Sequence, residues 1–103
     1  MKKVIGGLRY DTETAEKVAQ HWDGYQSDHG HVCESLYRTK NGRWFLAGEG
    51  GPASRYAKSV DGNGRIGGSG IVPVTPEVAR EHLEGWDQSE ASEAFEYFDI
   101  KDA

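Results

Sequence analysis

The sequence has little cysteine and no long apolar run. Cys33 stands alone, so no disulfide can form within the chain, and no stretch approaches the roughly 20 apolar residues that a membrane-spanning helix needs. The lysines at the start are followed only by Val4 and Ile5 before a glycine pair, which is too short an apolar segment for a signal peptide. These absences predict a cytoplasmic protein, in a compartment where thiols stay reduced, with no membrane partner.

Hydrophobic residues are scarce as well. They make up 36% of the 103 residues, and 14 glycines dilute the apolar content further. Three tryptophans, five tyrosines and three phenylalanines offset this shortage, because each aromatic ring buries a large area. A chain of this length is too short for two independent cores. We therefore expect one domain over residues 1–103, with a thin core.

The charged residues are distributed unevenly. Residues 77–103 hold nine acids against two bases, a net charge of −7, whereas residues 1–76 hold eight acids and ten bases, a net charge of +2. A strongly acidic C-terminal third is unsuited to direct contact with nucleic acid and favours a basic partner.

Two hairpins are predicted from turn residues between strand-like runs. Residues 2–5 and 8–10 flank a glycine pair that readily forms a tight turn. Residues 33–40 and 43–47 flank Asn41-Gly42, which favours a two-residue type I′ turn. The expected register pairs Tyr37 with Leu46, Thr39 with Trp44 and Arg38 with Phe45, which puts Tyr37, Trp44 and Leu46 on a core face.

Further strands are expected after a loop at residues 48–52. Residues 55–60 and 70–74 are strand-like, and a glycine-rich connection joins them. Pro73 lacks an N–H group, so the second of these strands should lie at an edge of the sheet.

Apolar spacing predicts three helices. Ala15, Val18, Ala19 and Trp22 recur at helical spacing, which indicates an early helix ended by Gly24. Thr75-Pro76 is typical of a helix start, and a final helix should begin near residues 87–89. The expected inward residues of these two helices are Val78, Ala79, His82, Leu83, Trp86, Ala91, Ala94, Phe95 and Phe98. The predicted fold is therefore α+β: an antiparallel sheet of four to five short strands with one early helix and a C-terminal helical pair.

Two motifs contain residue types that carry chemistry in other proteins. His29, His31 and Cys33 are metal-ligand types, but none of the common zinc spacings occurs, and polar loop histidines beside a half-buried cysteine explain the same residues. Residues 62–67 match G-x-G-x-x-G, yet a strand-like run follows where a dinucleotide site needs a helix. No nucleophile–base arrangement stands out either. We expect no metal, no cofactor and no enzymatic activity.

The acidic segment is the remaining candidate for a partner-binding site. Carboxylates three and four positions apart on a helix lie about 5–6 Å from one another, a spacing similar to the periodic charge of a nucleic-acid backbone. An ordinary solvent-facing helix surface explains the same glutamates, and this alternative stays open. The candidate residues are Glu77, Glu81, Glu84, Asp87, Glu90, Glu93 and Glu96.

Residues 9–16 (RYDTETAE) and 34–51 (ESLYRTKNGRWFLAGEGG) resemble a family of small proteins carried by phages and other mobile elements, which includes an anti-CRISPR inhibitor of type I-C immunity. The resemblance spans about residues 4 to 74. It implies a non-enzymatic inhibitor that acts in the bacterial host cytoplasm on the crRNA-guided Cas surveillance complex, at a surface that would otherwise receive DNA.

The acidic residues lie mostly outside the matching segment, so their role as an acidic DNA mimic is predicted from the charge pattern alone. We expect a monomer that makes no direct contact with nucleic acid. The alternative is a phage-encoded protein-binding module with a different, non-CRISPR partner, acting through residues 25–31 or the glycine-rich loop.

Overall fold

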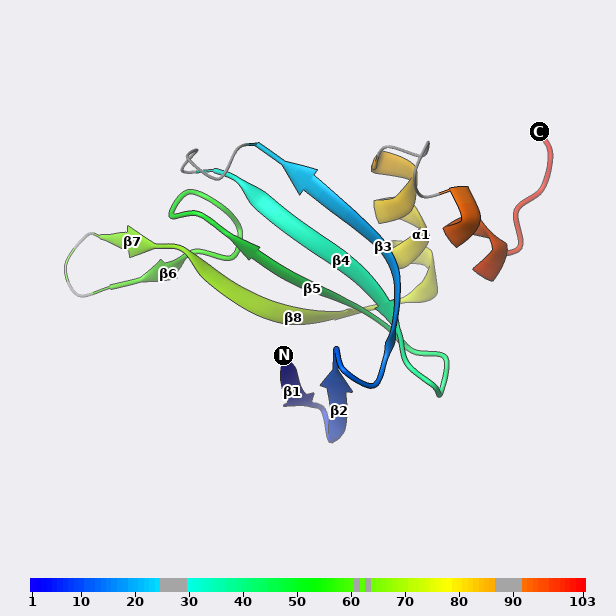
Figure 1. The fold of residues 1–103 in the computed structure, drawn as a ribbon, viewed down its shortest axis with the longest axis horizontal. Helices are drawn as coiled ribbons and strands as arrows, with labels where there is room; N and C mark the ends of the chain where they lie inside the picture. The colour runs from blue at the N-terminus through cyan, green and yellow to red at the C-terminus, as the bar shows by residue number, and fades with distance from the viewer. Residues whose placement is uncertain (25–29, 61, 63, 87–91) are drawn as a thin grey trace.

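A computed structural model describes residues 1–24, 30–60, 62, 64–86 and 92–103 of the chain. Its centre is a four-stranded antiparallel sheet in the order β3-β4-β5-β8 (Figure 1). The strands are β3 (Glu16–Asp23), β4 (Val32–Arg38), β5 (Trp44–Gly50) and β8 (Gly68–Val74). The predicted α+β class with an antiparallel sheet is confirmed.

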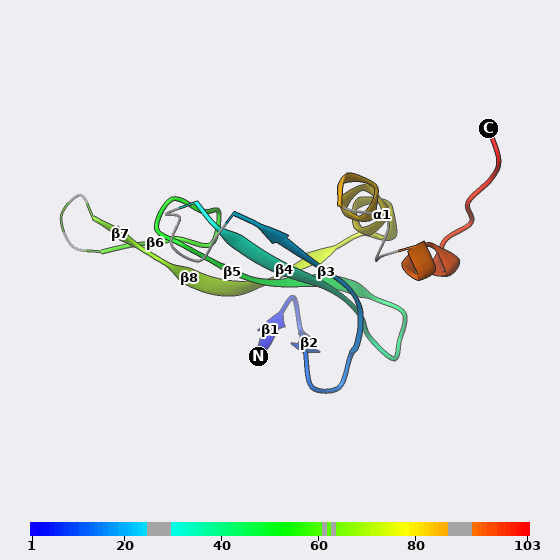
Figure 2. The ribbon, with the colours of Figure 1, turned by 45° about the horizontal axis from the view of Figure 1, so that its top comes forward.

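Two small hairpins and two helical segments make up the rest of the secondary structure among the described residues. The hairpins are β1–β2 (Lys2–Ile5 and Leu8–Asp11) and β6–β7 (Lys58–Ser59 and Arg65–Ile66). The helical segments are α1 (Pro76–Gly85) and the short 3-10 helix η1 (Ser92–Tyr97). Figure 2 shows α1 on one side of the sheet and the β1–β2 hairpin on the other.

Each face of the sheet has its own core cluster. On the helix side, Leu36, Trp44 and Leu46 pack with Ala79 and Leu83 of α1. On the hairpin side, the buried cluster consists of Tyr10, Phe45, Ala47 and Ile71. Strand alternation sends neighbouring residues such as Phe45 and Leu46 to opposite faces, so both faces are apolar near the middle of the sheet.

The early helix predicted around residues 15–22 is wrong, because this segment forms β3. β3 pairs with β4, and a bulge between Lys17 and Ala19 shifts the register. The bulge leaves two successive residues, Val18 and Ala19, partly buried against the helix-side cluster, whereas Ala15 packs on the opposite face. Trp22 is 54% exposed. The helix-like spacing therefore arises from a bulged strand and the residue before it, which pack on opposite faces of the sheet.

The β4–β5 hairpin forms, but its register differs by one residue from the predicted one. Arg38 pairs with Trp44, Tyr37 with Phe45, and Leu36 with Leu46. A type I′ turn needs positive φ at both central residues, but here only Gly42 has it, at 82°. The Thr39 N–H donates to the Arg43 carbonyl at 2.8 Å, so the loop between these two residues has three residues. Tyr37 consequently lies on the same face of the sheet as Phe45. Leu36 occupies the core position that was predicted for Tyr37.

The strands after this hairpin are partly as predicted. β5 continues through Gly50, so the loop expected at residues 48–52 begins only at Gly51. The strand expected over residues 55–60 is reduced to β6, which pairs with β7 around the glycine-rich segment. The edge position predicted from Pro73 is confirmed, since β8 is the last strand of the sheet.

The C-terminal helical pair is partly matched. Thr75 caps α1 as predicted, and its hydroxyl accepts a 3.2 Å hydrogen bond from the Val78 N–H. The final helical segment is a 3-10 helix of six residues with Ala94 buried, in place of a longer α-helix. The start predicted near residues 87–89 lies outside the described residues.

Candidate functional site

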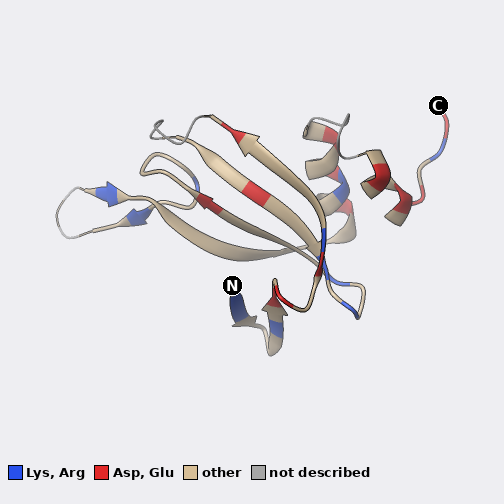
Figure 3. Ribbon diagram, viewed as in Figure 1, with Lys and Arg blue, Asp and Glu red and all other residues tan. Residues whose placement is uncertain are grey.

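Five of the seven predicted carboxylates lie in the described part of the chain, and all five are exposed. We call this set the acidic helical surface: Glu77, Glu81 and Glu84 on α1, with Glu93 and Glu96 on η1. Asp87 and Glu90 lie outside the described residues. Figure 3 shows Asp and Glu along both helical segments.

The packing of α1 and η1 explains why these carboxylates face solvent together. Ala79 and Leu83 of α1 and Ala94 of η1 belong to one buried cluster against the sheet. Apolar residues at helical spacing occupy the inner side, so the glutamates between them are directed outward. One glutamate has a basic neighbour on the same helix: Arg80 Nε lies 3.3 Å from Glu84 Oε2, at ion-pair distance but without hydrogen-bond geometry.

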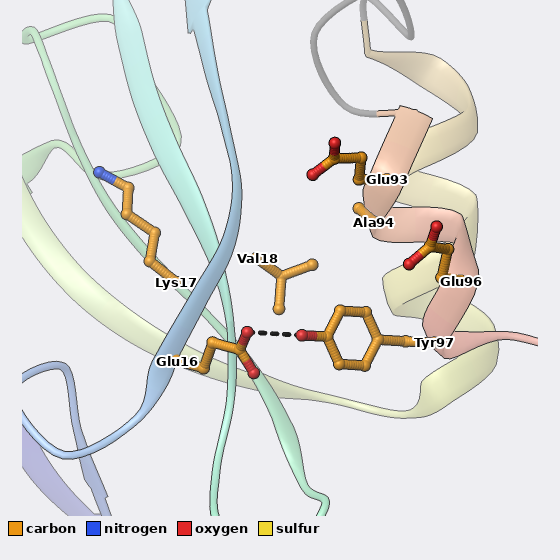
Figure 4. A pocket seen from close by; sticks show the side chains of 7 residues that line it. All are labelled: Glu16, Lys17, Val18, Glu93, Ala94, Glu96 and Tyr97. Carbon is orange, nitrogen blue, oxygen red and sulfur yellow. Dashed lines mark hydrogen bonds between the residues drawn. The ribbon is translucent and has the colours of Figure 1, made fainter.

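A cleft of about 500 Å³ separates η1 from β3 and extends the acidic helical surface onto the sheet. Its lining includes Glu93 and Glu96 on the η1 side, with Glu16 and one cation, Lys17, on the β3 side (Figure 4). The hydroxyl of Tyr97 donates a 2.5 Å hydrogen bond to Glu16 Oε1 and so ties η1 to β3. This hydrogen bond raises the pKa of the Tyr97 hydroxyl.

Glu16 was missed at the sequence level because residues 15–22 were expected to form a helix. It lies 81 positions from Tyr97 in the chain, and no local motif connects the two. Only the pairing of β3 with β4 brings Glu16 to the edge that η1 covers. The predicted acidic surface therefore contains a carboxylate from the sheet as well as those of the helices.

A buried polar cluster under residues 51–57 is a second feature that the sequence did not reveal. The Glu34 side chain is fully buried, and its two carboxylate oxygens accept hydrogen bonds from Tyr56 and Arg55. The Tyr56 ring lies directly over Gly48, and a Cβ added to this glycine would come within 2.3 Å of the ring. The signal available in the sequence was Gly48 itself, because a glycine inside a strand often marks the close approach of another group.

The structure also bears on the two other sequence motifs, the histidine–cysteine segment and the glycine-rich motif. Among residues 1–24, 30–60, 62, 64–86 and 92–103, no group of three or more His, Cys, Asp or Glu side chains could hold a metal ion. Cys33 accepts a 3.3 Å hydrogen bond from Gln20, and His29 lies outside the described residues. The G-x-G-x-x-G segment contains β7 and leads into β8.

The fold and this surface define a small α+β protein with an acidic helical layer on an antiparallel sheet. No family model, no curated protein and no solved structure matches the chain. No helix within the part of the chain that the structure describes is long and apolar enough to cross a membrane.

Proposed function

We propose that this protein is an anti-CRISPR inhibitor whose acidic helical surface occupies a basic, DNA-receiving surface of a type I-C crRNA-guided surveillance complex. The observation that carries the proposal is the grouping of exposed carboxylates on α1 and η1, extended by Glu16 across the adjacent cleft. The resemblance of residues 9–16 and 34–51 to the phage-borne family supports the choice of target.

The excess of acids in residues 77–103, with a net charge of −7, supports the same proposal. Figure 3 shows Lys and Arg on β1 and on the β6–β7 hairpin, while three cations lie at or next to the acidic helical surface: Arg80 on α1, Lys17 in the lining of the cleft, and Arg38, whose guanidinium lies 5.5 Å from the centre of the Tyr97 ring. Such an excess of acids attracts the acidic helical surface to a basic groove and speeds association at low salt.

The helical scaffold suits a surface that imitates a charged polymer. Side chains three and four positions apart on a helix are about 5–6 Å from each other, close to the separation of successive phosphates along a strand. Because α1 and η1 share the buried cluster with Trp44 and Leu46, their carboxylates are held on a fixed support. A fixed array loses less conformational entropy on binding than a flexible tail would.

The test removes charge without changing shape. Replacing Glu81, Glu93 and Glu96 with glutamine spares the Arg80–Glu84 ion pair and should weaken binding to a purified type I-C complex by about tenfold or more, since each exposed charge contact contributes up to about 1 kcal/mol. The matched control carries Glu13→Gln, Asp23→Asn and Glu49→Gln, which are exposed acids elsewhere on the molecule with the same total charge change.

The control should bind like the unmodified protein. Equal losses in both variants would mean that net charge alone matters, and equal binding by all three proteins would remove the acidic helical surface from the interface. Failure of the unmodified protein to bind the complex would favour a non-CRISPR partner.

A further inference from the structure

A cleft of about 510 Å³ lies over the helix-side face of the sheet and reaches the outer edge of β8. Residues from both faces of this strand line it, among them Ile71 and Val72. Lys3 lines it from the hairpin beneath the sheet, while residues 55–58 and α1 line it from the helix side. Because lining residues come from above, below and along the strand, the cleft includes the edge itself.

The edge of β8 is available for pairing within the described part of the chain, since β8 hydrogen-bonds there only to β5. In an edge strand, proline is tolerated where its nitrogen faces away from the neighbouring strand. Pro73 pairs with Phe45, so its nitrogen should face the cleft. In a strand, the backbone polar groups of alternate residues point to the same side. Those of Ser69 and Ile71, four and two residues before Pro73, therefore point the same way as the Pro73 nitrogen. Their N–H and C=O groups are therefore directed into the cleft.

The side chains around this edge are cationic and apolar, in a protein of net charge −5. Lys3 and Lys58 are exposed on its two sides, and Arg55 lies beside Lys58. The acid of the lining, Glu34, is fully buried and already bonded to Arg55 and Tyr56. The apolar part includes Val72, which is 47% exposed. An extended segment with acidic and small apolar side chains complements this lining.

We propose that the edge of β8 binds an extended acidic segment of a partner protein by strand addition. The partner's backbone would pair with Ser69 and Ile71, its carboxylates would meet Lys3 and Lys58, and its apolar side chains would cover Val72. Pro73 ends the pairing, because it offers no donor there. This site is separate from the acidic helical surface and does not depend on the proposed inhibitor function.

The probe is a capped pentapeptide that alternates glutamate and valine, and binding is followed by the amide resonances of the whole protein. We expect shifts at Ser69 and Ile71. Two control peptides separate the contributions: one with methylated backbone nitrogens, which cannot pair, and one with lysine in place of glutamate. Each should bind about tenfold more weakly or worse, because the first loses backbone hydrogen bonds and the second meets like charges.

Variants of the protein test the same edge. Ser69→Pro removes one outward donor and should weaken binding of the glutamate–valine peptide about tenfold, whereas Ser69→Ala should leave it unchanged. Lys3→Glu combined with Lys58→Glu should reverse the preference between the glutamate and lysine peptides. The amide spectrum of each variant verifies its fold.

Three outcomes would each overturn the proposal. They are absence of binding at about 1 mM peptide, equal binding of the backbone-methylated peptide, and shifts confined to residues away from β8.

Discussion

The hydroxyl of Tyr56 donates a 2.6 Å hydrogen bond to Oε2 of Glu34, a carboxylate whose side chain has no exposed surface. Arg55 donates to the other oxygen of the same carboxylate. Tyr56 belongs to the segment that crosses the sheet after β5, and its ring fills the space that the missing side chain of Gly48 leaves. One buried acid and one glycine thus hold this segment on the sheet.

Tyr56→Phe should destabilise the protein by about 2 kcal/mol, because a hydrogen bond to a buried charged group is lost while the ring remains. Chemical denaturation followed by tryptophan fluorescence measures the change. Tyr97→Phe is the matched control: it also removes a hydroxyl bonded to a glutamate, but at an exposed site, so it should change stability less. An equal loss in both variants would contradict a special role for the buried Glu34.

Gly48→Ala should destabilise the protein by about 1–3 kcal/mol, since the new methyl group would lie 2.3 Å from the Tyr56 ring. Gly30→Ala is the control, because nothing lies within 4 Å of its added Cβ and its φ is ordinary. Thermal unfolding compares the two. Combining Gly48→Ala with Tyr56→Leu should cost less than the sum of the single changes, because the shorter side chain relieves the overlap. Strict additivity would show that the two residues do not contact each other.

Stability should fall at alkaline pH because of Tyr56. Burial, assisted by the hydrogen bond to Glu34 and by its charge, raises the pKa of the Tyr56 hydroxyl above the ordinary value of 10.0. The folded protein therefore keeps a proton that the unfolded chain releases, and its extra stability is complete below pH 10 and lost as the pH rises further. Denaturation between about pH 9 and 11 tests this. Tyr56→Phe should show a shallower decline, and parallel curves would contradict the assignment.

Two substitutions in the β4–β5 loop distinguish the three-residue loop from a two-residue type I′ turn. Gly42→Ala should cost about 1 kcal/mol, because Gly42 has φ of 82°, whereas Asn41→Ala should have a smaller effect, since Asn41 does not have positive φ. Thermal unfolding of the two variants measures the difference. Similar losses at both positions would indicate the two-residue type I′ turn and the other register.

The elements that local residues specify were predictable. The Thr75-Pro76 start of α1 and the edge position of Pro73 follow from hydrogen-bond donors and φ restrictions that act within a few residues. β3 was not predictable in this way, because its bulge at Val18 mimics helical spacing and only pairing with β4 decides between the two. The Asn-Gly pattern favours a turn with two positive φ angles, but this loop has one, at Gly42. The β4–β5 register therefore differs from the predicted one.

The candidate site shows the same division. The glutamates of α1 and η1 were predicted from their spacing, because an amphipathic helix directs its polar residues outward whatever it packs against. Glu16 joins them only through the sheet, by its bond to Tyr97. The buried environment of Glu34 also depends on tertiary structure. A lone glutamate in a strand carries no local sign of Tyr56 and Arg55, which bond to it.

Target DNA binding by a purified type I-C surveillance complex tests the central proposal most directly. The measurement compares double-stranded target DNA binding with and without an excess of this protein, at two salt concentrations. The acidic helical surface predicts loss of DNA binding that added salt relieves, and about tenfold more of the Glu81, Glu93 and Glu96 glutamine variant should be needed for the same loss. DNA binding that the unmodified protein leaves unchanged at both salt concentrations would contradict the proposal.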